Sequence, residues 1–220
     1  SKLGFDIDLD TLKSISENKL LIKEVAAERV LDEMNKMVVG KHLVKALDSI
    51  VKTGVDKILP GLKKGINYLS ETKQNPKPII FYSLCFSLNN GIPSYWKFSN
   101  LYKHKLNQIV TLVNKNALFT NEDLYHYGLE LVTLANEVKN VLKRPSQKEQ
   151  DLENIYNNLV IKSSLDLKFR ARDILNITNK KAGAWVNNLI NEMVEKVINK
   201  ELGNTYEELK TFVLNNYERF

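Results

Sequence analysis

The sequence predicts an all-α protein, and three observations carry this prediction. Apolar residues recur at helical spacing along the whole chain, and no segment of useful length alternates with a period of two. Helix-capping patterns stand just before several of these apolar stripes. Nine Gly and five Pro in 220 residues are too few for a many-turned all-β chain. We therefore expect roughly ten helices of about three turns each.

The expected positions of the first helices follow from capping residues and from residues that break a helix. Asp8 precedes a helix start and is expected to cap it, with Asp10 favourably placed in the first turn. Asp6 and Asp8 could instead hold a metal ion from one face of a strand. Because no strand and no third carboxylate accompany them, we favour the cap and expect no metal site. A core-facing stripe follows at 27–38, and Asn75-Pro76-Lys77-Pro78 breaks the chain before an apolar helix expected at Ile79–Leu88.

The later helices show the same signals. Thr120 and Asp123 form a near-capping box before a stripe at 124–138. A further stripe runs over 182–197, and Thr205 with Glu208 forms a capping box that opens the last helix.

Composition limits the functional classes. No apolar run approaches the roughly 18 residues that a membrane span requires, and the single cysteine, Cys85, cannot form an internal disulfide. We expect a reduced, cytoplasmic protein that does not enter a membrane. The formal net charge is +6, and residues 41–115 hold 12 Lys or Arg against 3 acidic residues, a local +9. Such clustering is typical of a phosphate-binding surface, although the abundant Lys and Asn also fit codon bias.

A charge run at 28–36 looks at first like a solvated helix face. Its spacing allows Arg29 to pair with Glu33, and Asp32 with Lys36, each at i, i+4.

Taken in order, several motifs resemble the bacterial class II tRNA nucleotidyltransferases, the CCA-adding enzymes. The resemblance covers essentially the whole chain. It rests on Leu3-Gly4-Phe5-Asp6-Ile7-Asp8 with Thr11-Leu12 and Ile15, on Glu28-Arg29-Val30 with Glu33 and Lys36, on Thr53-Gly54-Val55 and Ile58-Leu59-Pro60-Gly61-Leu62, and on Asp173-Ile174-Leu175, Gly183-Ala184-Trp185-Val186 and Glu201-Leu202-Gly203-Asn204.

The resemblance implies an elongated neck, body and tail, here assigned to 1–40, 41–143 and 144–220. It implies that the whole enzyme adds CCA to the tRNA 3′ end from CTP and ATP, with Mg²⁺ bound by a catalytic head that would precede this chain. We expect no catalytic residue, metal or cofactor here, and no incorporation by this chain alone. The resemblance also implies that four residues brace the helix turn that carries the base-reading side chains: Glu28, Arg29, Glu33 and Lys36.

The body and tail are expected to bind the acceptor and T arms of tRNA through backbone phosphates. The candidate contacts are Lys63, Lys64, Lys103, Lys105, Lys180 and Lys181. Two alternatives stay open: a helical protein-interaction scaffold whose charge reflects codon bias, or a relative that adds only CC, only A or poly(A). A homodimer also stays open.

Overall fold

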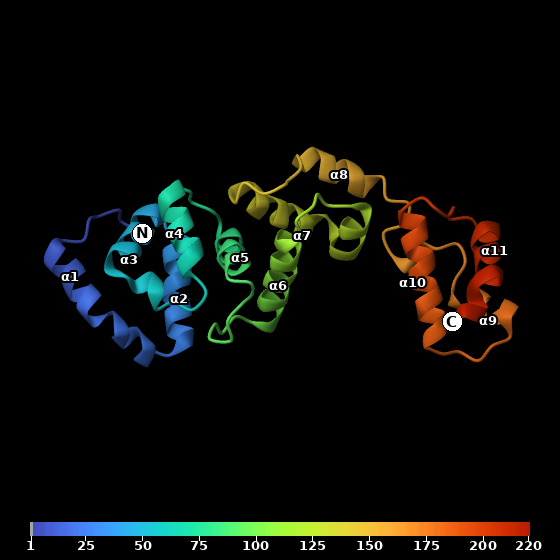
Figure 1. The fold of residues 1–220 in the computed structure, drawn as a ribbon, viewed down its shortest axis with the longest axis horizontal. Helices are drawn as coiled ribbons and strands as arrows, with labels where there is room; N and C mark the ends of the chain where they lie inside the picture. The colour runs from blue at the N-terminus through green and yellow to red at the C-terminus, as the bar shows by residue number, and fades with distance from the viewer. Residues whose placement is uncertain (1) are drawn as a thin grey trace. The chain divides into compact units, whose positions relative to one another are not determined.

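The computed structural model describes residues 2–220, and every regular element in this range is helical (Figure 1), which confirms the all-α prediction. Short 3-10 helices connect the α-helices: η1 (Lys19–Glu24), η2 (Val55–Lys57), η3 (Ser164–Asp166) and η4 (Tyr217–Arg219). The α-helices are α1 (Leu9–Asn18), α2 (Ala27–Val38), α3 (Leu43–Thr53), α4 (Lys63–Thr72), α5 (Pro78–Leu88), α6 (Asn100–Asn114), α7 (Asn121–Val141), α8 (Glu149–Asn157), α9 (Ala171–Thr178), α10 (Ala184–Ile198) and α11 (Tyr206–Asn216).

The chain forms two compact units. Leu118–Thr133 and Gln147–Phe220 make up the second unit, and the remainder makes up the first. The chain therefore changes unit three times, near residues 117, 133 and 146. The division into neck, body and tail at residues 40 and 143 stays a prediction.

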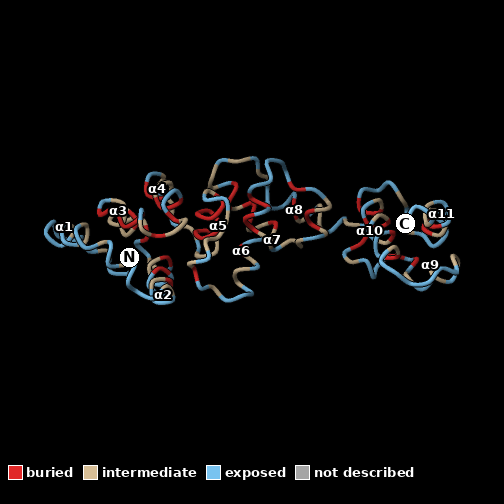
Figure 2. Tube along the Cα trace, turned by 60° about the horizontal axis from the view of Figure 1, so that its bottom comes forward, coloured by how far each residue is buried: buried red, intermediate tan, exposed pale blue. Residues whose placement is uncertain are grey.

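Helix α5 forms the core of the first unit. Its residues Ile80–Ser87 are all buried, as the red stretch of the tube shows (Figure 2). Pro78 occupies its first turn, where the missing N–H costs no hydrogen bond. Helices α4 and α6 pack on it, and α2 contacts it as well. Because an apolar helix of this kind needs cover on every side, α5 organises its neighbours.

Helices α4 and α5 approach most closely at Gly65. A Cβ atom built at Gly65 would lie 2.3 Å from the Cys85 Sγ atom and 2.7 Å from the Cys85 Cα atom. Burial raises the pKa of the Cys85 thiol, so this cysteine has a packing role. The contact leaves room for no side chain at position 65.

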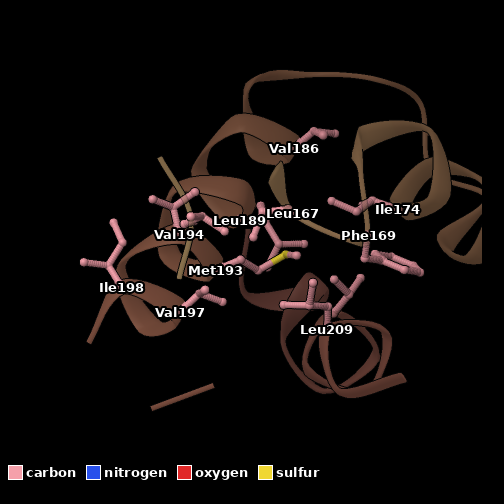
Figure 3. Close-up of a cluster of buried hydrophobic side chains, with 12 residues drawn as sticks. Leu167, Phe169, Ile174, Val186, Leu189, Met193, Val194, Val197, Ile198 and Leu209 are labelled. Carbon is pink, nitrogen blue, oxygen red and sulfur yellow. The ribbon is translucent and has the colours of Figure 1, made fainter. Parts of the chain in front are cut away.

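The second unit has its own core (Figure 3). Helices α9, α10 and α11 contact one another around Leu189, Met193 and Val197 of α10. Twelve buried residues make up this cluster: Ile161, Leu167, Phe169, Ile174, Val186, Leu189, Met193, Val194, Val197, Ile198, Leu209 and Val213.

The predicted caps are present. The Asp8 carboxylate accepts a hydrogen bond from the Thr11 N–H at 2.9 Å, and hydrogen bonds from Thr11 lower the pKa of Asp8. Asp123 accepts from the Thr120 N–H at 2.9 Å, and the Thr205 hydroxyl accepts from the Glu208 N–H at 3.3 Å. These contacts confirm the caps at the starts of α1, α7 and α11.

Helix α7 is not continuous, contrary to the single stripe expected at 124–138. Gly128 has φ 74° and ψ 164°, which interrupts the helix between its two halves. Apolar residues on both sides keep the helical spacing, and Leu124, Val132, Ala135 and Val138 are buried. The periodicity therefore identified the helical residues but did not show the break. The break falls at Gly128 because only glycine adopts this backbone conformation readily.

We predict that Gly65→Ala lowers the free energy of unfolding by about 1–3 kcal/mol, the usual cost of overpacking. Helix propensity alone would raise it by about 1 kcal/mol, so the sign of the change separates the two effects. Chemical denaturation measures it, with Glu71→Ala as a control on the exposed face of the same helix. A variant as stable as the parent would show that α4 and α5 can move apart freely.

We also predict that Gly128→Ala is destabilising by about 1–3 kcal/mol, the usual cost of a strained backbone conformation. No atom lies within 4 Å of the added Cβ, so the cost comes from the backbone alone. Thermal unfolding followed by circular dichroism measures it. An unchanged melting temperature would mean that α7 straightens without penalty.

Candidate nucleic-acid interface

Lys63 and Lys64 lie in the first turn of α4, and both are exposed. The start of this helix has no side-chain cap and no acidic residue in its first turn. Cations at a helix N-terminus interact unfavourably with the helix dipole. These two lysines therefore do not serve the stability of α4, and their charge is available to a ligand.

Lys103 and Lys105 lie on α6, whose N-cap Ser99 accepts a hydrogen bond from the Tyr102 N–H. Both lysines are half-buried. Residues two apart on a helix point to different sides. Lys103 and Lys105 therefore point to different sides of α6, although they are close in sequence. Tyr102 packs beside Phe98, with ring centroids 5.4 Å apart.

Lys180 and Lys181 lie in the loop between α9 and α10, in the second unit, and both are exposed. The Lys180 Nζ atom lies over the rings of Trp185 and Tyr217. The Lys181 side chain makes no hydrogen bond or ion pair with any residue from 2 to 220. These adjacent lysines thus differ in their surroundings, which the sequence did not indicate.

The four brace residues lie on α2. The Lys36 Nζ atom pairs with Glu33 at 2.8 Å, three residues away, and this bond raises the pKa of Lys36. The pairs of Arg29 with Glu33 and Asp32 with Lys36, which the spacing allowed, do not form: within residues 2–220, Lys36 bonds to Glu33 instead and Arg29 has no ion pair. Both i+3 and i+4 neighbours lie within reach on a helix, so spacing alone could not choose. Glu28 and Arg29 are exposed, and the bracing role stays a prediction.

The sequence analysis missed a contact between residues 2–8, here called the N-terminal arm, and α3. The Lys45 Nζ atom donates to the Gly4 carbonyl at 2.8 Å and pairs with Asp6 at 2.9 Å. Gly4 has φ 73°, and a Cβ there would lie 2.8 Å from the His42 ring. The two partners of Lys45 are about 40 residues away in sequence, so no local pattern could show this contact.

The arm forms one wall of a hollow of about 970 Å³. Phe5, Ile7, Met37 and Ile50 contribute apolar surface to it, and Lys36 also lines it. Neither α1 nor η1 has a buried residue, and α1 is drawn in pale blue and tan without red (Figure 2). Eight large apolar side chains between residues 3 and 39 are exposed: Leu3, Phe5, Ile7, Leu9, Leu20, Leu21, Val25 and Val39. Residues 3–39 thus expose apolar side chains that the described chain leaves uncovered.

No group of three or more His, Cys, Asp or Glu residues is arranged to hold a metal ion within residues 2–220. None of the helices described there has the length and apolar character needed to span a bilayer.

Comparison with known families identifies the chain. Residues 84–213, more than half of the chain, match the family model described as tRNA nucleotidyltransferase domain 2 (putative). The chain belongs to the tRNA nucleotidyltransferase family. Residues 4–66 match a second model, described as a probable RNA and SrmB-binding site of polymerase A. The two models together cover both units and confirm the resemblance found in the sequence.

Individual relatives agree with the family. A CCA-adding enzyme of Listeria monocytogenes serotype 4b (strain CLIP80459) is 26% identical over 97% of this chain and 57% of its own length. A CCA-adding enzyme of Geobacillus sp. (strain WCH70) is 25% identical over 97% of this chain and 56% of its own length. The chain therefore spans a little more than half the length of these relatives.

A solved structure shows the same fold. The crystal structure of the Bacillus stearothermophilus CCA-adding enzyme in complex with CTP superimposes with a TM-score of 0.82 at 24% identity. It covers 100% of this chain and 59% of its own chain. The helical fold is thus that of a CCA-adding enzyme over the whole described range.

We predict that the backbone amides of α1 and η1 exchange their hydrogens much faster than those of α5. Local stability follows buried apolar contact, which α5 has and the first two elements lack. Hydrogen–deuterium exchange with mass spectrometry measures the difference at several protein concentrations. Equal protection in α1 and α5, in a strictly monomeric sample, would contradict it.

Proposed function

We propose that this chain is the tRNA-binding part of a CCA-adding nucleotidyltransferase. The whole enzyme would add CCA to the tRNA 3′ end from CTP and ATP, and Mg²⁺ would act with residues outside this chain. The acceptor and T arms of tRNA would lie on the body and tail, in the cytoplasm. The observation that carries the proposal is the local charge of +9 over 41–115, together with the exposed Lys63 and Lys64, which lie in residues 4–66, the range matched by an RNA-binding family model.

Duplex RNA suits this surface for a physical reason. An RNA helix is recognised mostly through its shape, its 2′-hydroxyls and its phosphates, because its major groove is too narrow for side chains. Lysines on packed helices can contact these phosphates without contacting the bases. Lys63 and Lys64 on α4 and Lys103 and Lys105 on α6 are the contacts we propose in the first unit, with the Lys180–Lys181 loop in the second.

A protein-interaction scaffold was the main alternative, and the family match does not favour it. The relatives described above are all CCA-adding enzymes, so enzymes that add only CC, only A or poly(A) are not favoured either. The exposed apolar side chains between residues 3 and 39 are the one observation that still supports the protein-interaction hypothesis.

We predict that Lys63→Glu/Lys64→Glu and Lys103→Glu/Lys105→Glu each weaken tRNA binding and reduce its dependence on salt. Each lysine that contacts a phosphate should contribute about 0.7 to 0.9 to the slope of log affinity against log salt. Fluorescence anisotropy with a tRNA transcript that lacks CCA measures both quantities. The loss should be similar for different tRNAs, because phosphate contacts carry no sequence information.

The matched control is Lys148→Glu/Lys200→Glu, which makes the same change of charge at exposed lysines that lie outside the basic segment and outside residues 4–66. We expect it to retain the parent slope. A control that weakens binding as much as the other two double variants would show that only total charge matters. Unchanged slopes in both test variants, with folding intact, would exclude an RNA surface at these lysines.

A further inference from the structure

The loop between α9 and α10 is exposed yet held in place. Residues 179–183 are all exposed, and no core side chain anchors them. Asn179 has φ 51° and its N–H donates to the Leu175 carbonyl at 3.1 Å, which ends α9. The contacts that fix the rest of the loop come from Lys180, Trp185 and Tyr217.

Lys180 makes the first of these contacts. Its Nζ atom lies 5.5 Å from the centroid of the Trp185 ring and 5.0 Å from the centroid of the Tyr217 ring. The same atom donates to the Tyr217 carbonyl at 3.3 Å. Both ring distances lie within the range of a cation–π interaction, for which Trp is the best partner. One ammonium group thus joins the loop to the start of α10 and to η4.

Trp185 makes the second contact. Its Nε1–H donates to the Lys181 carbonyl at 2.9 Å, so the indole binds two consecutive loop residues. The backbone of Lys181 is therefore fixed, while its side chain stays exposed and bonds to no other described residue. A charged side chain on a fixed backbone loses less conformational entropy when it binds a ligand.

We propose that Lys180 is a positioning residue, which holds the loop so that Lys181 contacts a phosphate of bound RNA. The inference rests on the proposed function and assigns different roles to the two lysines. Lys181 contacts the RNA, and Lys180 acts through Lys181. A lysine whose charge lies between two rings is less available to a phosphate than its exposed neighbour.

Binding measurements separate the two roles. Lys181→Met should reduce the salt slope for a tRNA transcript without CCA by about 1. Lys180→Met should reduce it by a similar amount, and Lys180→Arg should restore it, because Arg keeps a cation over both rings. The double variant Lys180→Met/Lys181→Met should lose no more than Lys181→Met alone, since both changes remove the same contact. Additive losses would show that Lys180 contacts phosphate itself and would overturn the proposal.

Tryptophan fluorescence tests the positioning without RNA. Trp96 is buried, so acrylamide quenching reports mainly on Trp185. Quenching should increase in Lys180→Met and return to the parent value in Lys180→Arg. Lys162→Met is the matched control, because Lys162 lies over Tyr156 at 4.6 Å in the same unit, away from this loop. It should leave quenching unchanged.

The outcomes distinguish this inference from the proposed function. Unchanged quenching in Lys180→Met, with tRNA binding by the parent intact, would overturn the positioning role alone. If the parent chain shows no salt-sensitive tRNA binding, the proposed function fails, and the phosphate contact of Lys181 fails with it.

Discussion

The first unit depends on the burial of Ile80–Ser87, the middle of α5. A helix with no polar face has to be covered all round, and α2, α4 and α6 supply that cover. The closest of these contacts uses Gly65, where the α4 backbone meets Cys85 without a side chain between them. The surface positions of α4 and α6 follow from this packing. Lys63, Lys64 and Lys103 therefore occupy sites on helices that the core holds still.

The sequence predicted the helices well because their signals are local. Apolar spacing and capping pairs involve residues three or four apart, and each can be recognised without knowing the rest of the fold. The sequence did not reveal the break at Gly128, because the apolar pattern continues through it and a single glycine in a helical pattern is ambiguous. Residues 118–133 belong with the second unit although they precede residues 134–146 of the first, and no local pattern shows this return of the chain.

The candidate site was less predictable because its contacts are distant in sequence. Residue types and charge clustering identified the lysines, but not which of them have partners. Lys180 meets Tyr217 across 37 residues, and Lys45 meets Gly4 across 41. Even on one helix the geometry offered two choices, and Lys36 bonds to Glu33 rather than Asp32. What a lysine contacts is decided by tertiary packing, which charge spacing does not encode.

The acidic residues of the basic segment explain why its charge remains available. Only Asp48, Asp56 and Glu71 are acidic between residues 41 and 115. Asp48 accepts hydrogen bonds from Lys73 and Ser70, which lower its pKa against the opposing effect of its burial. Asp56 is buried, and its Oδ1 atom has no hydrogen-bond partner among residues 2–220. Glu71 alone remains exposed. Basic groups thus outnumber acidic ones in this segment, and a polyanion that supplied counter-charge would relieve the repulsion between its lysines.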